Sequence, residues 1–226
     1  MRLPGVWFGF SAAWGLFAIV GSGIAGEDPQ AAALSKEVGR RGWIVFATSP
    51  LEITGQPPGA KNEPRGPADL YLVRPDGSNL RNITNTAEFR EYGGRFSPDG
   101  TKLLYRRVRS DRPMNHDVWG AVGELVIAGA DGSNPVVQGS DGEYPWACWS
   151  PDGQRIACLW KKDGVIRIHD LRTKKVLQEM PDQGIYQQMF WSPDGRRLCG
   201  TANVAGRQWN VVAIDLDTQR FTVLSR

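Results

Sequence analysis

The fold of this chain is decided by three copies of one short segment: F-S-P-D-G at Phe96–Gly100, W-S-P-D-G at Trp149–Gly153 and W-S-P-D-G at Trp191–Gly195. Each copy places an aromatic residue before a turn. Pro presets φ near the value that a turn needs, Asp can bond the backbone two residues on, and Gly accepts positive φ. The pattern therefore predicts three hairpin turns with the same chemistry.

The spacing of these turns indicates a repeat architecture. The aspartates at positions 99, 152 and 194 lie 53 and 42 residues apart, which is typical of propeller blades. We expect a strand after each turn, at 102–108, 155–160 and 197–202, and interpret the aromatic before it as a packing residue between blades. Third and fourth strands are expected at 124–129 and 134–138, and in hairpins at 167–177 and 210–224.

Four strands per unit is the plan of a propeller blade. The sequence therefore predicts an all-β fold, a β-propeller of four-stranded antiparallel blades with about four blades present, in an open or partial ring. The first unit is expected to be incomplete, with strands at 43–48, 70–74 and 80–84 and no S-P-D-G of its own. The predicted blades are 42–84, 92–138, 144–180 and 186–226.

The W-S-P-D-G segments, together with D-G-S turns at Asp76 and Asp131, resemble the TolB-like, WD-repeat-like propeller repeats over residues 42–226. That resemblance implies an exported, non-catalytic scaffold that binds a protein partner in the cell envelope. It does not extend to a full-length TolB, whose propeller has six blades and follows an α/β domain. The same repeats occur in prolyl-oligopeptidase-like hydrolases, so the alternatives are part of such an enzyme or a carbohydrate-active, lyase-like propeller.

The N-terminus has the pattern of a signal peptide. Arg2 precedes an uncharged apolar run from Val6 to Val20, and small residues at Gly23 and Ala25 suit a signal peptidase. We predict a signal peptide at 1–25, cleavage after Ala25, and a linker at 26–41. The mature protein would be periplasmic or secreted and would have no membrane span; the alternative is an uncleaved anchor.

Composition gives no sign of a charged partner. The chain has 27 basic and 24 acidic residues, a net charge of +3. Removing Arg2 with the signal peptide leaves 26 against 24, or +2. A nucleic-acid binder normally shows a basic stripe, so we expect no nucleic-acid partner.

Catalytic and metal-binding patterns are missing from the sequence. It contains no G-x-S-x-G and only two histidines, His116 and His169, so we predict no enzyme activity. The D-G-S-N turns do not match a calcium loop, and we predict no metal and no cofactor. Cys148 and Cys158 flank one predicted hairpin; a bridge between them stays open beside their interpretation as small buried hydrophobes.

Function is expected at the rim opposite the S-P-D-G turns. Loops that connect second to third strands, and those entering first strands, share that rim and carry aromatic and charged residues suited to a protein partner. The predicted partner-binding set is Arg90, Glu91, Tyr92, His116, Asp117, Trp119, Tyr144, Trp146 and Tyr186. An open blade edge also predicts self-association, because its backbone groups lack a neighbouring strand.

Overall fold

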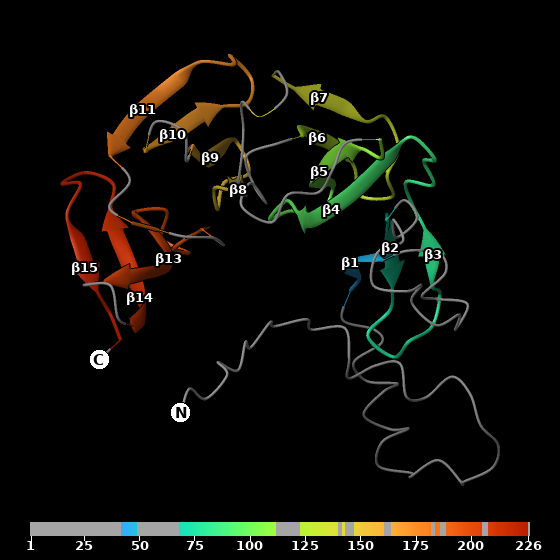
Figure 1. Cartoon of the computed structure of the whole chain (residues 1–226), viewed down its shortest axis with the longest axis horizontal. Helices are drawn as coiled ribbons and strands as arrows, with labels where there is room; N and C mark the ends of the chain where they lie inside the picture. The colour runs from blue at the N-terminus through green and yellow to red at the C-terminus, as the bar shows by residue number, and fades with distance from the viewer. Residues whose placement is uncertain are drawn as a thin grey trace, which may run out of the picture. The chain divides into compact units, whose positions relative to one another are not determined.

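The computed structural model describes residues 42–48, 68–111, 123–139, 142, 147–160, 164–181, 184–185, 189–204 and 208–225. In these residues all regular structure is β, and none of it is helical (Figure 1). The predicted signal peptide and linker lie outside them.

The chain divides into two compact units. The smaller unit comprises Met1–Ile44 and Val73–Leu80, and the larger comprises Val45–Leu72 and Arg81–Arg226. In the smaller unit, the Arg74 guanidinium lies 4.0 Å from the centre of the Trp43 ring. It also donates a hydrogen bond to the carbonyl of Gly42 at 3.0 Å, which ties the D-G-S turn region to the start of the described chain.

Four sheets follow one another along the chain. Sheet 1 contains β1 (Ile44–Thr48), β2 (Asp69–Val73) and β3 (Arg81–Asn82). Sheet 2 contains β4 (Phe89–Phe96), β5 (Lys102–Arg109), β6 (Glu124–Gly129) and β7 (Val136–Gln138). Sheet 3 contains β8 (Cys148–Trp149), β9 (Arg155–Trp160), β10 (Val165–Asp170) and β11 (Val176–Pro181). Sheet 4 contains β12 (Phe190–Trp191), β13 (Arg197–Val204), β14 (Gln208–Asp215) and β15 (Phe221–Val223).

Each four-stranded sheet keeps its strands in sequence order, which is the antiparallel meander of a propeller blade. This confirms the predicted all-β propeller fold; in the first blade the described residues form three strands. One predicted boundary was wrong. We expected Arg90–Tyr92 in a connection before the second blade, but β4 already begins at Phe89, because Phe89 pairs with Arg109 and extends the ladder.

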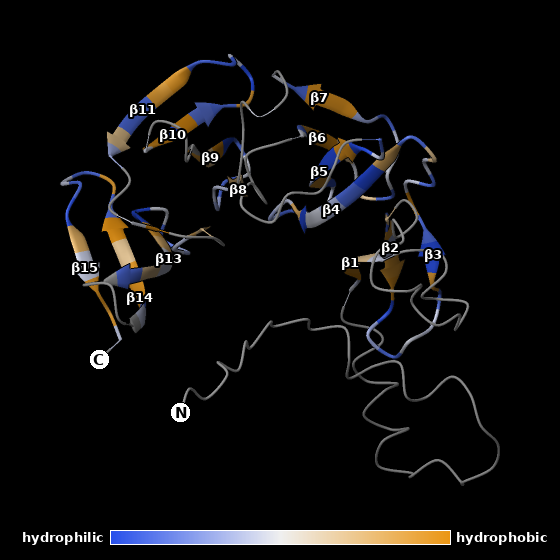
Figure 2. Ribbon diagram, in the orientation of Figure 1, coloured by the Kyte–Doolittle hydropathy of each residue, from blue (hydrophilic) through white to orange (hydrophobic). Residues whose placement is uncertain are grey.

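The core lies between successive sheets. Figure 2 shows apolar residues on the strands and hydrophilic residues on the turns that join β10 to β11 and β14 to β15. The aromatic before each S-P-D-G packs at these interfaces, as predicted: Trp149 of sheet 3 is 8% exposed and lies in one cluster with Leu104 and Leu125 of sheet 2. Its Nε1–H donates to the carbonyl of Arg95 at 3.1 Å. The indole therefore joins two blades by packing and by a hydrogen bond.

Cys148 and Cys158 are free thiols, each 2% exposed. Cys148 pairs with Ala157 across β8 and β9, so Cys158 points to the opposite face of sheet 3. The bridge left open by the sequence is thereby excluded, and both residues act as small buried hydrophobes.

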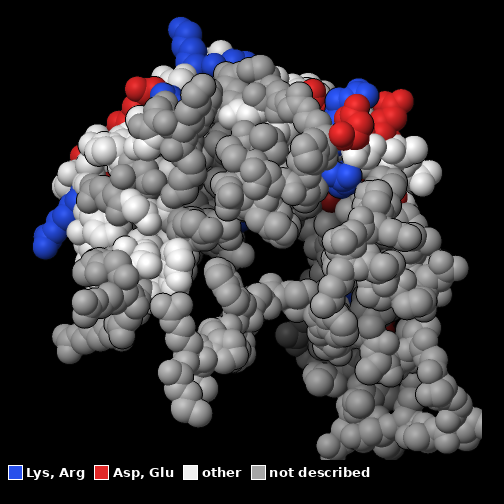
Figure 3. All heavy atoms as spheres, viewed as in Figure 1, with Lys and Arg blue, Asp and Glu red and all other residues white. Residues whose placement is uncertain are grey.

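Charge on the described surface is mixed. On the face drawn in Figure 3, Lys and Arg side chains lie close to Asp and Glu side chains. No patch of one sign is visible there among the described residues, in keeping with the nearly balanced composition.

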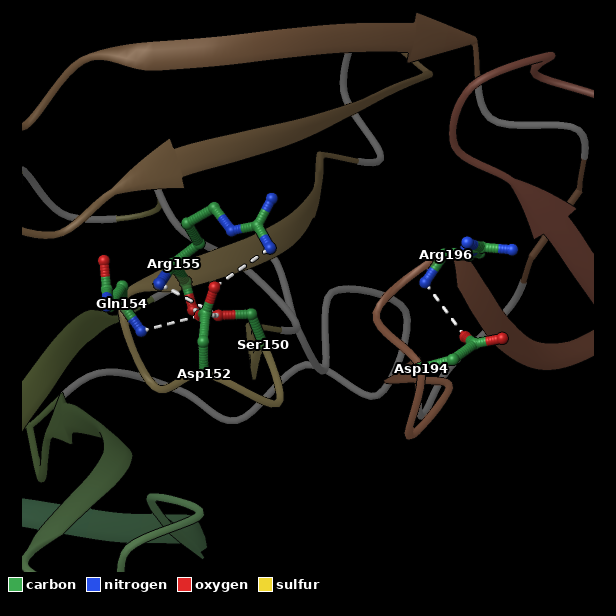
Figure 4. A network of polar contacts seen from close by, with 6 residues as sticks. All are labelled: Ser150, Asp152, Gln154, Arg155, Asp194 and Arg196. Atoms are coloured by element: carbon green, nitrogen blue, oxygen red, sulfur yellow. Dashed lines mark hydrogen bonds and ion pairs between the residues drawn. The ribbon is translucent and has the colours of Figure 1, made fainter.

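Each S-P-D-G turn has the same pattern of hydrogen bonds. Figure 4 shows this pattern for the turn of sheet 3. Asp152 Oδ1 accepts hydrogen bonds from Ser150 Oγ at 2.5 Å and from the Gln154 N–H at 3.0 Å. Ser150 Oγ in turn accepts from the Arg155 N–H at 2.9 Å, and Gly153 has φ +68°. Burial alone would raise the pKa of Asp152, but the hydrogen bonds from Ser150 and Gln154, together with the charge and the hydrogen bond of the Arg155 guanidinium, outweigh it and lower the pKa. The predicted Asp-to-backbone bond is confirmed.

In each complete blade the second hairpin is tied to the first. The residue after the third strand donates its N–H to a carbonyl in the S-P-D-G turn: Ala130 to Thr101 at 3.0 Å, Leu171 to Gln154 at 3.0 Å, and Leu216 to Arg196 at 2.9 Å. Both turns of a blade therefore lie at the same end of the sheet. The other end carries the opposite rim.

Turn chemistry also accounts for the D-G-S segment of the larger unit. Asp131 Oδ1 accepts from the Ser133 N–H at 3.1 Å, and Gly132 has φ +87°. Among the described residues there is no group of three or more His, Cys, Asp or Glu that could hold a metal ion.

Candidate functional site

The structure places three of the nine predicted partner-binding residues. Arg90, Glu91 and Tyr92 lie in β4. The other six stay predictions because they lie outside the described residues: His116, Asp117, Trp119, Tyr144, Trp146 and Tyr186.

The start of β4 and the end of β5 form a rim at the end of sheet 2 opposite its turns. We call it the sheet-2 rim and define it by Phe89, Arg90, Tyr92, Arg107 and Arg109. The Arg107 guanidinium lies 4.3 Å from the centre of the Phe89 ring. Arg90 donates to the carbonyl of Ser110 at 2.6 Å, so its side chain also holds the chain that leaves β5.

Accessible cations and aromatic rings meet on this rim. The Arg109 side chain is 57% exposed and lies 3.3 Å from Asp111, which is 66% exposed. An ion pair this open contributes little to stability, so Arg109 can exchange its partner at low cost. Tyr92 is half-buried, with the Arg106 guanidinium 5.8 Å from its ring centre. Tyr and Arg are enriched in protein interfaces.

The sequence reasoning missed Phe89, Arg107 and Arg109. A signal was present, because Arg106, Arg107 and Arg109 form a dense basic run at the end of a predicted strand. The sequence analysis interpreted that run as part of a strand and not as part of a binding surface. The pairing of β4 with β5 is what brings these cations beside the aromatic residues of β4.

Glu91 is a correction to the predicted contact surface. Its side chain is 1% exposed, because alternation along β4 turns it toward the interior while Arg90 and Tyr92 point to the other face. A buried carboxylate cannot touch a partner. Its backbone N–H donates to the carbonyl of Ala68 at 2.7 Å, which joins sheet 2 to sheet 1.

The Glu91 carboxylate lies among polar groups that only partly replace water. Thr86 Oγ1 donates to it at 2.5 Å and Thr84 Oγ1 at 3.4 Å. Burial raises the pKa of Glu91 to about 7; the Thr86 hydrogen bond opposes this rise and the nearby charge of Asp69 adds to it. Burial also raises the pKa of Tyr105, with the Glu91 charge as a smaller cause. The Glu91 carboxyl group therefore titrates close to neutral pH.

Asp69 continues this network into sheet 1. Its Oδ2 accepts from Asn82 Nδ2 at 2.7 Å, and its Oδ1 accepts from the Thr86 N–H at 3.1 Å. Thr86 thus contacts both buried carboxylates, Asp69 through its backbone and Glu91 through its hydroxyl. Together they fix the segment that leads from sheet 1 to sheet 2, directly behind the sheet-2 rim.

β4 has a bulge directly after Tyr92. The register with β5 shifts between Tyr92 and Arg95, where two glycines stand. Gly93 has φ +69°, and a Cβ on Gly94 would lie 2.8 Å from Val45 Cγ2. Glycine is therefore required at 94 so that β1 can approach β4 closely.

His169 lies in β10 and is 6% exposed, a sheet residue as expected.

No helix in the described part of the chain is long and apolar enough to cross a membrane.

The comparisons with known proteins add the fold class. No family model matches the sequence, and no curated protein matches it. Solved structures do: a TolB-like protein from Agrobacterium tumefaciens is 19% identical with a TM-score of 0.52, over 70% of this chain and 56% of that one. A puromycin-hydrolyzing peptidase of Mycobacterium tuberculosis is 18% identical with a TM-score of 0.50, over 82% of this chain and 27% of that one.

A nidogen/laminin complex is 14% identical with a TM-score of 0.50, over 70% of this chain and 56% of that one. The chain thus spans about half the length of the TolB-like and nidogen/laminin structures and less of the peptidase. Identities this low establish the fold alone. Propellers of the TolB type are among the chains that share it.

Proposed function

We propose that this protein is an exported, non-catalytic propeller scaffold that binds a protein partner in the cell envelope through the sheet-2 rim. One observation carries the proposal. The rim collects Phe89, Tyr92 and three arginines at the end of a blade, where the exposed Arg109 pairs with Asp111, which is itself exposed to solvent. Each face of this blade end carries an aromatic residue beside an arginine, Phe89 with Arg107 and Tyr92 with Arg106, and these residue types are typical of interface hot spots.

The rigid surroundings of the rim support the same function. Arg107 donates to Glu124 at 2.7 Å, and Arg90 holds the carbonyl of Ser110, so two of the rim cations are fixed before any partner arrives. A surface fixed in advance loses less conformational entropy on binding. The TolB-like neighbour and the nidogen/laminin complex are consistent with such a scaffold role, although each supports only the fold.

The experiment is capture of the partner from an envelope fraction by tagged protein. Tyr92→Ala with Arg109→Glu should lower capture at least about tenfold, since each removes a hot-spot type of side chain. The matched control is Arg172→Glu, which reverses an exposed arginine in the turn between β10 and β11, at the turn end of sheet 3. Equal loss in both variants, or no loss in the rim variant, would contradict the proposed surface.

The alternative, a propeller portion of a prolyl-oligopeptidase-like hydrolase or a lyase-like carbohydrate enzyme, has its own measurement. Purified protein would be assayed with short peptides and with oligogalacturonides. We expect no turnover above a blank. Turnover by the wild type above the blank would refute the non-catalytic proposal.

A further inference from the structure

A groove of about 470 Å³ lies between sheets 2 and 3. One wall comes from β6 and β7 and carries Ile127, Val136 and Gln138; the other comes from the turn between β10 and β11 and carries Leu171 and Lys174. A groove of this volume falls within the range of small-molecule sites, about 300–1,000 Å³. We call it the sheet 2–3 groove.

The turns around the groove all belong to the described part of the chain. They are residues 97–101 and 130–135 of sheet 2, and residues 150–154 and 171–175 of sheet 3. Both sheets have all four strands. The sheet 2–3 groove therefore reflects how two complete blades pack, and it does not depend on where the sequence ends.

The next pair of blades has a glutamine at this place. Positions are counted from the residue that ties the two hairpin turns of a blade, which is Ala130 in sheet 2, Leu171 in sheet 3 and Leu216 in sheet 4. By this count, and by the pairing of the third and fourth strands, Gln178 of β11 stands where β7 has Val136. Gln178 Nε2 donates to the carbonyl of Leu216 at 2.6 Å and so spans from sheet 3 to sheet 4.

Val136 cannot make the equivalent contact, because valine has no amide group. It is 57% exposed, and Leu171 is half-buried, whereas the corresponding Leu216 is 6% exposed. The sheet 2–3 groove therefore distinguishes this pair of blades from the next one.

The charge beside the groove also differs from the other blades. In sheets 3 and 4 an arginine at the start of the second strand stands opposite an aspartate: Arg155 opposite Asp170, and Arg197 opposite Asp215. In sheet 2 the corresponding Lys102 stands opposite Gly129, and both residues line the groove. Within the described part of the chain, no carboxylate forms an ion pair with Lys102.

Lys174 brings a second ammonium group to the groove. Its Nζ donates to Gln138 Oε1 and so joins sheet 3 to sheet 2. Gln138 is 7% exposed, and its Nε2 donates to the carbonyl of Val136 at 3.1 Å, which fixes the amide. An ammonium group has three N–H donors, and Gln138 accepts from one of them. The other donors of Lys174 can bind an anion.

The carboxylates of the neighbouring turns do not line the groove. Each accepts hydrogen bonds from an N–H group of its own turn: Asp99 from Thr101, Asp131 from Ser133, Asp152 from Gln154 and Asp170 from Thr173. Among the described residues, none that lines the groove is acidic.

We propose that the sheet 2–3 groove binds a small organic carboxylate with an apolar body. The carboxylate group is bound by Lys102 and Lys174. The apolar body contacts Ile127, Val136 and Leu171, which are partly exposed in the groove and lose contact with water on binding. The inference goes beyond the proposed function, because it uses the turn end of sheet 2 and not the sheet-2 rim.

The test is a titration of the full chain with 4-phenylbutanoate at low salt, followed by saturation-transfer NMR. We expect saturable binding. Two comparison compounds separate the contributions of charge and apolar contact. 4-Phenylbutanol has the same body without the charge, and inorganic phosphate has the charge without the body. Each should bind at least about tenfold more weakly than 4-phenylbutanoate.

The charge is tested by Lys102→Gln with Lys174→Gln. This double variant should weaken the binding of 4-phenylbutanoate at least about tenfold. It should fold, because both side chains are exposed and because glutamine is the native residue at the position equivalent to 174, where Gln219 has φ +56°. Lys175→Gln is the matched control, since Lys175 is the next residue of the turn, is exposed and does not line the groove.

The shape is tested by Val136→Gln, which leaves both lysines in place. Glutamine at this position can span to sheet 3 as Gln178 spans to sheet 4, so the binding of 4-phenylbutanoate should weaken. Four results would overturn the proposal: no saturable binding by the wild type, equal binding of either comparison compound, equal weakening by Lys175→Gln, or unchanged binding in Val136→Gln.

Discussion

Replacing the buried Glu91 by glutamine should change how the stability of this protein depends on pH. Burial raises the pKa of Glu91 from an ordinary value of 4.5 to about 7 in the folded chain. The folded state therefore keeps its proton in a pH range where the unfolded chain has lost it. The contribution of Glu91 to the free energy of unfolding therefore falls as pH rises from about 4.5 to about 7, and it levels off above that.

The size of the effect follows from the difference between the two pKa values. Each unit corresponds to about 1.36 kcal/mol, so ionising Glu91 in place costs the folded state about 3 kcal/mol above neutral pH. Glu91→Gln cannot ionise and keeps the shape of the side chain. We expect the variant to be more stable than wild type at pH 8. The gain should be about 3 kcal/mol, reduced by the stability that is lost if glutamine accepts weaker hydrogen bonds from Thr86 and Thr84.

The measurement is urea unfolding followed by tryptophan fluorescence at pH 4.5, 6, 7 and 8. The titratable and charged groups that face Glu91 are Asp69, Tyr105 and Arg107, and all three are present in both proteins. A difference in how the free energy of unfolding changes with pH therefore reports Glu91 itself. Glu179→Gln is the control, since that carboxylate is 56% exposed. Identical slopes for wild type and Glu91→Gln, or a large loss of stability in the variant at pH 8, would refute the reasoning.

Three further outcomes are expected. Asp152→Ala should lower the free energy of unfolding by about 1–2 kcal/mol, because the turn loses the acceptor for Ser150 Oγ and the Gln154 N–H, while alanine at the exposed Asp217 should cost less in the same urea titration. Gly94→Ala should cost about 1–3 kcal/mol, since its Cβ would press on Val45 at 2.8 Å; an unchanged thermal midpoint would contradict this. N-terminal sequencing of protein recovered from an envelope fraction should begin at Gly26, and a sequence starting at Met1 would disprove the predicted cleavage.

The strands could be predicted because their signals are local. Each S-P-D-G turn carries its own φ preferences and hydrogen-bond acceptor, and the strands on either side alternate apolar and polar residues. For that reason β6 and β9 begin and end where the sequence placed them. β3 is shorter than the predicted 80–84, and β4 begins before residue 92, the predicted start of the second blade, because strand ends depend on which residues of the neighbouring strand are within pairing distance.

The candidate site was predictable only in part. The sequence predicted function at the rim opposite the turns, and this stays a prediction; the hydrogen bond from Leu171 to Gln154 and its equivalents show that the two hairpin turns of a blade lie at one end. It did not separate Glu91 from its neighbours Arg90 and Tyr92. Strand alternation predicts that neighbours point to opposite faces, but which face is buried depends on where sheet 1 lies.

By itself, the sequence determined the blade: an aromatic residue, a Pro-Asp-Gly turn and a meander of strands, all set by contacts between residues close in the chain. Only the tertiary structure decided which side chains the blades hide. Leu125, Ile166 and Val211 occupy one position of the repeat, and the first two are buried while Val211 is 47% exposed. Burial is a property of what packs against a face, and the residues that do so lie in another sheet.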